Sequence, residues 1–295
     1  MNAADTIITL ATRSEPRSIG DILVASGRLR PTDLHRILDR QTKNDIPFGE
    51  AAVALNLLTK DDIDQALSQQ FHYAYLSPSD TRLSPELVAA YQPFGVAGES
   101  LRAVRSQLVL RWFNGDPARK VLTVVSAAAG EGRSFVAANL AIVFAQQGQR
   151  TLLIDADLRA TPERGQHSLF KLERGHGLSA VLAGRASLSE SMQSVPSLPS
   201  LVVLPAGAVP PNPQELLGQA SFGKLLHSAA QQFDVILIDT PAGSAFADAE
   251  LIASRAGAAL IVARKHLTLL QQTSQLSKRL QDGGVALIGS VLNDA

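Results

Sequence analysis

The chain has 295 residues with 27 basic and 27 acidic side chains, so its formal net charge is zero. Without a basic excess it lacks the electrostatic attraction that nucleic-acid backbones require, and we expect no nucleic-acid partner. It has no cysteine, which excludes disulfides and thiol chemistry. The sequence shows neither a secretory signal nor the roughly 18 consecutive apolar residues that cross a bilayer, so we expect a cytoplasmic protein.

The first predicted elements form a tandem repeat. Residues 18–41 and 47–70 align at an offset of 29 positions. Each copy predicts a short helix, a turn and a second helix, and the second helices start near Pro31-Thr32 and Thr59-Lys60. One copy alone could not bury its apolar face, so we expect the two copies to pack together. The run F-H-Y-A-Y-L at 71–76 predicts a short strand that closes this module.

The repeat resembles the N-terminal domain of type II secretion and pilus ATPases, called MshEN, some members of which bind cyclic di-GMP. The resemblance implies either a cyclic di-GMP site or a protein-docking surface within residues 1–76. The family motif begins with arginine, whereas Ser18 and Pro47 stand at the matching positions here, and Asn56 replaces a glycine.

A linker is predicted between the module and a second domain. Residues 77–98 contain three prolines and two glycines, which indicates a linker with one short helix at 85–91. The second domain, residues 99–295, then opens with a helix. Its Glu99, Arg102 and Arg105 are spaced to share one broad face, which by itself is typical of a solvated charged stripe.

The sequence V-L-T-V-V-S-A-A-A-G-E-G-R-S at 121–134 predicts a buried strand, a Gly-rich turn and a helix. Backbone N–H groups at such a turn bind phosphate oxygens, and Gly130 and Gly132 allow the backbone to approach closely. The usual pattern ends G-K-[ST], but here Arg133 precedes Ser134. Arginine carries its charge in a planar fork instead of a compact ammonium. The loop therefore predicts phosphate binding and leaves phosphoryl transfer open.

Carboxylates follow two further apolar runs. Residues 151–155 end in Asp155, with Asp157 two places on, and residues 235–239 end in Asp239. Because ligands of open parallel sheets bind at the carboxyl ends of the strands, we expect these three side chains to face the Gly-rich loop. Carboxylate oxygens suit Mg²⁺.

The fold class follows from the alternation of apolar runs and helical stretches. Strands are predicted near 121–126, 151–155, 201–204, 235–239, 258–263 and 286–291. This pattern indicates an α/β P-loop fold, a mainly parallel sheet flanked by helices, with a small, mainly helical N-terminal domain.

Several motifs in order resemble those of bacterial tyrosine kinases (BY-kinases). S-A-A-A-G-E-G-R-S-F-V-A-A-N-L-A at 126–141 resembles their deviant Walker A segment, which MinD- and ParA-like ATPases share. D-A-D at 155–157 and D-T-P at 239–241 match the A-prime and Walker B motifs, and P-P-N-P-Q-E-L-L at 210–217 matches a further segment. The whole layout is similar to the chain-length-determinant kinases of exopolysaccharide operons.

This resemblance implies an ATP- and Mg²⁺-dependent protein-tyrosine kinase that works in exopolysaccharide assembly. It implies a membrane polysaccharide co-polymerase as partner, and attachment at the inner membrane through that partner. The implied ATP-binding residues are Gly130, Glu131, Gly132, Arg133, Ser134, Phe135 and Asn293.

The remaining implied roles are catalysis, metal binding and assembly. Arg133, Asp155 and Asp157 are the implied catalytic residues, one aspartate orienting or deprotonating a tyrosine hydroxyl. The implied Mg²⁺ ligands are Ser134, Asp155 and Asp239. Glu99, Arg102 and Arg105 match the ExxRxxR motif of subunit contacts, which implies a homo-oligomer.

Two other functions stay open. The sequence ends at Ala295 without the family's tyrosine-rich tail, and its tyrosines are Tyr73, Tyr75 and Tyr91, so we expect no autophosphorylation on a C-terminal cluster. Together with Arg133, this leaves open a catalytically weak ATP-binding adaptor. An ATPase switch like MinD or ParA is the third candidate, although Ala128 stands where those proteins carry an extra lysine.

Overall fold

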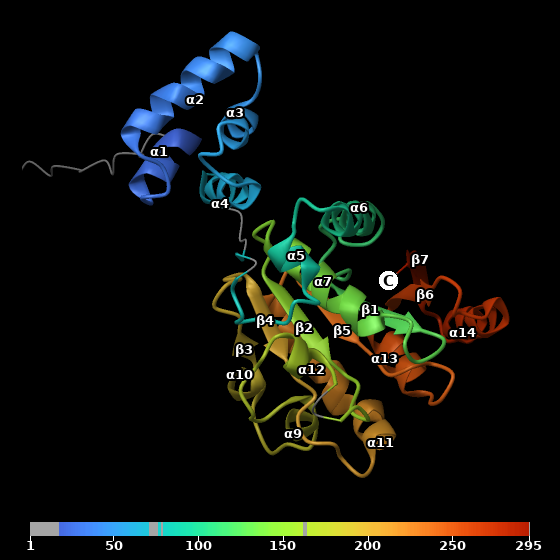
Figure 1. Cartoon of the computed structure of the whole chain (residues 1–295). Coiled ribbons are helices and arrows are strands. Elements are labelled where there is room, and N and C mark those ends of the chain that lie inside the picture. Colours follow the sequence, from blue (N-terminus) through green and yellow to red (C-terminus); the bar gives the residue numbers. More distant parts are fainter. Residues whose placement is uncertain (1–17, 71–75, 78, 162–163, 295) are drawn as a thin grey trace, which may run out of the picture. The chain divides into compact units, whose positions relative to one another are not determined.

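The computed structural model describes residues 18–70, 76–77, 79–161 and 164–294 (Figure 1). The chain divides into two compact units, residues 1–74 and 75–295. The strand predicted at 71–76 lies, apart from Leu76, outside the described residues. No described helix combines the length and the apolar character needed to cross a membrane.

The first unit confirms the predicted pair of helical repeats. Its helices are α1 (Ile19–Ala25), α2 (Pro31–Asn44), α3 (Phe48–Ala54) and α4 (Lys60–Gln70). Leu23, Ile37, Ala51 and Ile63, one from each helix, belong to one buried cluster. Each repeat therefore covers the apolar face of the other, as a pair of incomplete units must.

Local signals explain the ends of these helices. The Ser18 side chain accepts a hydrogen bond from the Asp21 N–H in a capping box at the start of α1. Thr59 does the same for Asp62 at the start of α4. Gly27 and Asn56, equivalent in the two repeats, both adopt left-handed backbone conformations, with φ of 70° and 53°. Asparagine tolerates this region better than most residues, so the turn survives the loss of the second glycine.

The second unit is built on a seven-stranded sheet of order β3-β4-β2-β5-β1-β6-β7. The strands are β1 (Val121–Ser126), β2 (Thr151–Asp155), β3 (Gln193–Ser194), β4 (Leu201–Leu204), β5 (Val235–Asp239), β6 (Ala258–Arg264) and β7 (Ala286–Asn293). Neighbouring strands run parallel except β3, which pairs antiparallel with β4. The six predicted strands are confirmed. The prediction missed β3, whose two residues are too few to show a periodic pattern.

Helices cover both faces of this sheet (Figure 1). They are α5 (Val88–Tyr91), α6 (Val96–Arg111), α7 (Arg133–Ala145), α8 (Gln166–Leu169), α9 (Leu178–Leu182), α10 (Leu188–Ser191), α11 (Pro213–Gly218), α12 (Ala220–Gln232), α13 (Asp248–Ala256) and α14 (Leu270–Asp282). Ile154 and Ile236 pack with Phe222 of α12 and Ile252 of α13. The alternate residue Leu153 is equally buried but lies outside that cluster, as the two-residue period of a strand requires.

Helix α7 is apolar on all sides and is buried from Val136 to Ala145. It contacts the sheet on one side and α5 and α6 on the other. Its central Asn139, fully buried, accepts a hydrogen bond from the Ala89 N–H and donates to the Glu86 carbonyl. The described part of residues 77–98, expected to be a linker, thus packs against the α/β domain, because Asn139 satisfies backbone groups that a free linker would leave to water.

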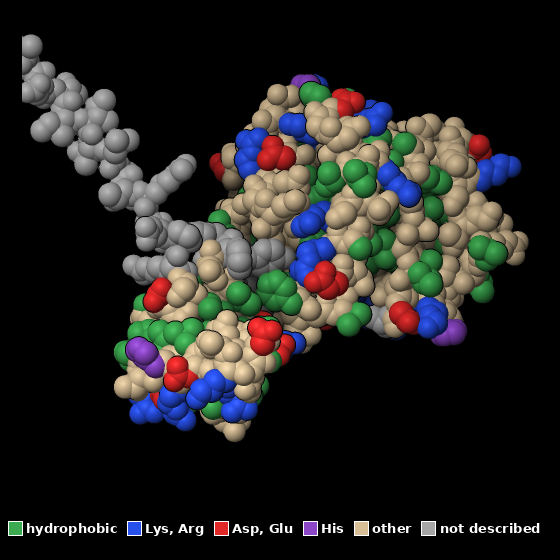
Figure 2. All heavy atoms as spheres, turned by 90° about the horizontal axis from the view of Figure 1, so that it is seen from above, with side chains coloured by type: hydrophobic (Ala, Val, Ile, Leu, Met, Phe, Trp, Pro, Cys, Tyr) green, Lys and Arg blue, Asp and Glu red, His purple; other side chains and the backbone are tan. Residues whose placement is uncertain are grey.

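Charges of both signs are interspersed with apolar side chains on the face drawn in Figure 2. This face carries no broad field of one sign, in agreement with the zero formal net charge.

Gly177, the residue that precedes helix α9, tests how tightly this unit is packed. A Cβ at Gly177 would lie 2.4 Å from the Pro205 carbonyl oxygen and 2.5 Å from the Gly207 nitrogen. Both are backbone atoms and cannot rotate away, so we expect Gly177→Ala to cost about 1–3 kcal/mol of unfolding free energy. Denaturant unfolding measures this cost. Gly218→Ala is the matched control, because nothing lies within 4 Å of its Cβ, and an equal loss in both variants would contradict the packing argument.

Candidate nucleotide-binding active site

The Gly-rich loop joins the carboxyl end of β1, a central strand, to the start of α7. Gly130 and Gly132 have φ of 80° and 88°, in the left-handed region that glycine enters without strain. A Cβ at Gly132 would lie 2.1 Å from Nδ2 of Asn293, at the end of β7. The sequence predicted both glycines, and the structure adds that Gly132 is held by the last strand.

A cavity of about 410 Å³ opens at this loop. It is lined by every predicted phosphate-loop residue from Gly130 to Phe135, and by Arg164 and Gly165 on the opposite side. A turn of backbone N–H groups at the start of the 13-residue helix α7 faces it, which is the arrangement that binds phosphate.

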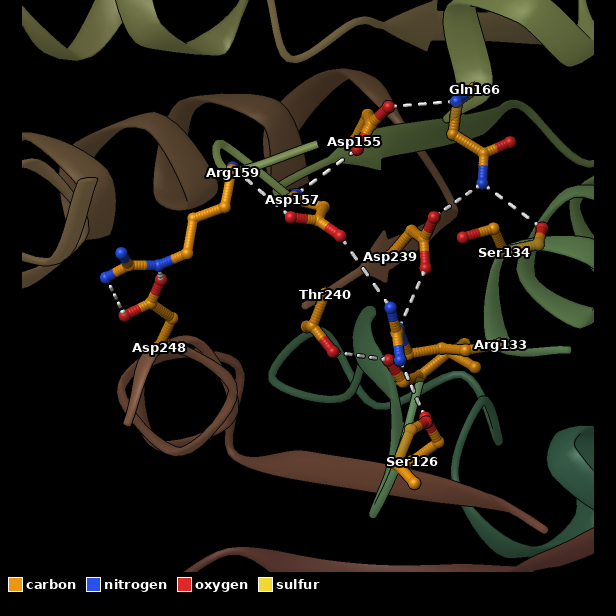
Figure 3. A network of polar contacts seen from close by, with 12 residues as sticks. Ser126, Arg133, Ser134, Asp155, Asp157, Arg159, Gln166, Asp239, Thr240 and Asp248 are labelled. Atoms are coloured by element: carbon orange, nitrogen blue, oxygen red, sulfur yellow. Dashed lines mark hydrogen bonds and ion pairs between the residues drawn. The ribbon is translucent and has the colours of Figure 1, made fainter. Parts of the chain in front are cut away.

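Arg133 points inward, toward Asp157, Asp239 and Ser126 (Figure 3). Its side chain is only 10% exposed. Nη1 donates to the Ser126 hydroxyl at 2.6 Å, Nε lies 3.5 Å from Oδ1 of Asp239, and Nη2 lies 3.7 Å from Oδ2 of Asp157. The guanidinium therefore lies among the carboxylates at the sheet edge.

The predicted carboxylates do converge. Asp155 and Asp239 end the neighbouring parallel strands β2 and β5, where they stand opposite each other in register. Gln166 connects them: its N–H donates to Asp155 at 2.9 Å, and its side-chain amide donates to Asp239 at 2.8 Å and to the Ser134 carbonyl at 3.1 Å. Gln166 was missed by the sequence analysis, because nothing in its local sequence marks it.

Burial governs the protonation of this pair. It raises the pKa of the Asp155 carboxyl to about 8, and the nearby charge of Asp239 adds to the shift. Burial also raises the pKa of Asp239, but there the positive charge of Arg133 and hydrogen bonds from Ser134 and Gln166 oppose the rise. Oδ1 of Asp239 is buried without a hydrogen-bond partner among the described residues. This oxygen faces Arg133 Nε at 3.5 Å, and a carboxylate oxygen is also the type of ligand that a hard cation prefers.

No group of three or more His, Cys, Asp or Glu side chains suited to a metal ion occurs within the described residues. The predicted Mg²⁺ ligands, Ser134, Asp155 and Asp239, nevertheless lie at one sheet edge. Mg²⁺ is commonly held by one or two carboxylates together with phosphate and water oxygens. The side chains present fit that mode of binding.

Asp157 is more exposed than its neighbours, at 20% of its side chain. Its backbone N–H donates to Asp155 at 3.2 Å, which fixes the turn after β2. The same turn is held from the far side by Arg159, which pairs with the fully buried Asp248 at 2.6 Å and stacks on Phe246 with 3.8 Å to the ring centroid. Asp157 is thus placed firmly at the edge of the site.

Glu131 ties the loop to the end of the sheet. Glu131 is only 1% exposed. Its buried carboxylate accepts hydrogen bonds from the Ala128 N–H, at 2.8 Å, and from the Thr268 hydroxyl. Its carbonyl accepts a hydrogen bond from Asn293 at 3.3 Å, and Arg264 donates to the Gly130 carbonyl at 3.1 Å. Glu131, predicted as a nucleotide-binding residue, lines the phosphate cavity, and its side chain also holds the loop in shape; its contact with nucleotide stays a prediction.

We expect Glu131→Ala to weaken nucleotide binding about tenfold, because the loop would lose two buried hydrogen bonds. Thr268→Val removes one of the same bonds. If the two residues act together, the double variant should lose less than the sum of the single losses in binding free energy. Titration calorimetry with ADP measures all three variants, and strictly additive losses would contradict the coupling.

The three residues predicted at a subunit contact lie on α6, where they also contact their own chain. Arg102 pairs with Glu99, donates to the Pro93 carbonyl and lies over the Phe94 ring. Arg105 donates to the Val143 carbonyl of α7 at 3.1 Å. Their role between subunits stays a prediction.

The sheet order, the left-handed glycine loop at β1 and the carboxylates at the ends of β2 and β5 define an α/β P-loop nucleotide-binding protein of the MinD-like type. Residues 119–282 match the family model described as an AAA domain. The chain is 34% identical over 213 residues to the tyrosine-protein kinase YwqD of Bacillus subtilis, covering 72% of this chain and 87% of that protein. It therefore belongs to the bacterial tyrosine-protein kinases.

Other relatives agree with this assignment. The tyrosine-protein kinase etk of Escherichia coli is 36% identical over 207 residues, which span 70% of this chain but only 28% of that longer protein. Its solved kinase domain superposes with a TM-score of 0.68 at 34% identity, covering 75% of this chain and 84% of that one. The septum site-determining protein MinD of Pyrococcus horikoshii, solved with Mg-ADP, has a TM-score of 0.51 at 25% identity, covering 59% and 69% of the two chains.

Proposed function

We propose that this protein is an ATP-dependent protein-tyrosine kinase that regulates the chain length and export of an exopolysaccharide. The observation that carries the proposal is the convergence of the Gly-rich loop with Asp155, Asp157 and Asp239 at one sheet edge. The kinship with tyrosine kinases supports the choice of substrate. In phosphoryl transfer most of the catalysis is positioning and charge stabilisation, so a sparse set of side chains suffices.

Each residue has a part in this reaction. The N–H groups from Gly130 to Ser134 bind the phosphates, and Arg133 neutralises charge on the β- and γ-phosphates once it turns outward. Bound Mg²⁺, held by Ser134 and Asp239 with Asp155 beside them, would supply further charge neutralisation. MinD of P. horikoshii, solved with Mg-ADP, supports this cofactor. Asp155 or Asp157 orients the acceptor hydroxyl and takes its proton, and Asn293 contacts the adenine.

The proposal includes partners. By likeness to its family the protein works in the cytoplasm, held at the inner membrane by the cytoplasmic tail of a polysaccharide co-polymerase that orders the site. Subunits contact each other through Glu99, Arg102 and Arg105 in a homo-oligomer. Residues 1–76 form an MshEN-like module that serves in protein docking. Ser18 and Pro47 stand at the N-caps of α1 and α3, where that family has its dinucleotide-binding arginine.

Transfer of γ-phosphate from labelled ATP to tyrosine, with and without the co-polymerase tail, tests the kinase. We expect transfer that Asp155→Asn abolishes. ATP binding without transfer from the wild type under any condition would contradict the proposal.

A second candidate is favoured by one observation. Arg133 lines the phosphate cavity, but its guanidinium is bound to Ser126 and faces Asp239 and Asp157. A protein that bound ATP but left Arg133 there would act as an ATP-dependent adaptor of the co-polymerase. An ATPase switch of the MinD type would instead show an ATP-dependent dimer in light scattering; Ala128 at the position of its extra lysine speaks against it.

A further inference from the structure

A second cavity, of about 190 Å³, adjoins the phosphate cavity. Arg164 lines both of them, so the two cavities meet at that residue. Asp155 lines the second cavity as well. Whatever fills the second cavity therefore lies within reach of a predicted catalytic carboxylate and of the bound phosphates.

The walls of the second cavity suit one apolar side chain. One wall is the turn after β4, residues 205–208, and the facing wall includes Ala160 and Thr161. The turn is held rigidly, because Gly177 packs against the Pro205 and Gly207 backbone and the Leu178 N–H donates to the Pro205 carbonyl at 2.7 Å. The volume is below the roughly 300–1,000 Å³ that encloses a drug-sized ligand. The space fits a single ring and not a whole metabolite.

The mouth of this cavity is cationic. Arg164 and Arg174 line it, both are exposed, and neither forms an ion pair or a side-chain hydrogen bond with a described residue. His167 also lines it, with its Nε2 atom buried and unbonded within the described part of the chain. The other arginines close to the active site are already used, since Arg133 and Arg159 face carboxylates. Arg164 and Arg174 are thus free to bind an anionic partner.

We propose that this cavity is the acceptor subsite, and that Arg164 and Arg174 select tyrosines flanked by Asp or Glu. The inference rests on the proposed kinase function and names its substrate class, an acidic tyrosine-containing segment. The ring lies against residues 205–208 and the hydroxyl points to Asp155. The phenolic proton passes to the carboxylate, the phenolic oxygen bonds to the γ-phosphorus, and the bond between that phosphorus and the β–γ bridging oxygen breaks, releasing ADP.

Two peptides of equal length test this assignment, one with Asp and Glu around a single tyrosine and one with Lys and Arg. With labelled ATP, we expect kcat/KM of the wild type to be about tenfold higher for the acidic peptide. Arg174→Glu should abolish or reverse the preference. The matched control is Arg185→Glu, an exposed arginine outside the cavity, which should leave the preference unchanged.

Two further measurements separate the subsite from the kinase activity. Ala206→Trp fills the cavity without touching the phosphate cavity, so it should abolish peptide transfer while ADP affinity stays unchanged. The same peptides with Phe for Tyr are titrated by fluorescence anisotropy. Charge-selective binding without any transfer would refute the kinase and keep the subsite. Transfer with equal kcat/KM for both peptides would refute the subsite and keep the kinase.

Discussion

Arg133→Ala is expected to lower phosphoryl transfer by about 10²–10³-fold, the usual loss when one charge-stabilising group of an active site is removed. The same change should destabilise the nucleotide-free protein. Asp239 is fully buried, and Arg133 is the cation that faces its Oδ1 atom at 3.5 Å. Without it the carboxyl takes up a proton or remains an unpaired buried charge, at a cost of about 1–3 kcal/mol.

The variant Arg133→Lys tests whether Arg133 takes part in phosphoryl transfer. A compact ammonium can follow the γ-phosphoryl group more freely than a planar fork bound to Ser126. We therefore expect transfer by Arg133→Lys to equal or exceed that of the wild type, and transfer by Arg133→Ala to be far below both. Single-turnover transfer and thermal unfolding measure the two effects, with the exposed Arg185→Ala as control. Unchanged transfer in Arg133→Ala would show that the arginine takes no part in the reaction.

The sequence was sufficient for the fold because its signals were long and local. Apolar runs such as 151–155 and 235–239, alternating with helical stretches, indicate parallel strands, and the common location of the carboxylates at their ends follows from chain direction. The repeat in residues 18–70 was equally visible, since an offset of 29 positions aligns its apolar residues. Each of these predictions needed only the order of residues within one element.

What the sequence could not give were contacts between elements distant in the chain. Gln166, the first residue of the short helix α8, connects Asp155 with Asp239, and no motif in its local sequence marks it. Residues 77–98 have the composition of a linker, and hydrogen bonds to distant residues, such as that of the Ala89 N–H with Asn139, show that they are docked. The inward direction of Arg133 is a third case, because a motif fixes the position of a side chain and not its rotamer.

Asp155→Asn should stabilise the nucleotide-free protein while abolishing transfer. The pKa of Asp155 is about 8 in the folded state, against about 3.9 in an unfolded chain. Between these values the unfolded state loses the proton and the folded state keeps it, so the carboxyl makes the wild type less stable as pH rises from about 4 to about 8. Asparagine does not titrate. The variant's advantage should therefore be absent near pH 4 and largest at pH 8 and above.

The hydrogen bonds around this carboxyl do not reverse the argument. Asp155 accepts from the N–H groups of Asp157 and Gln166 on different oxygens, and asparagine has only one oxygen to accept with. The variant therefore loses one of these hydrogen bonds, but at every pH alike, so the rise of its relative stability with pH remains. Calorimetric unfolding in EDTA at pH 5 and pH 8.5 measures the difference, and each kcal/mol should shift Tm by roughly 2–4 °C. Asp282→Asn, at the exposed end of α14, controls for a general effect of charge. A lower Tm for Asp155→Asn than for the wild type at pH 8.5 would contradict this prediction, because it would mean that the ionised carboxylate stabilises the protein without nucleotide. Any loss of transfer in the variant would then result from misfolding and not from a missing proton acceptor.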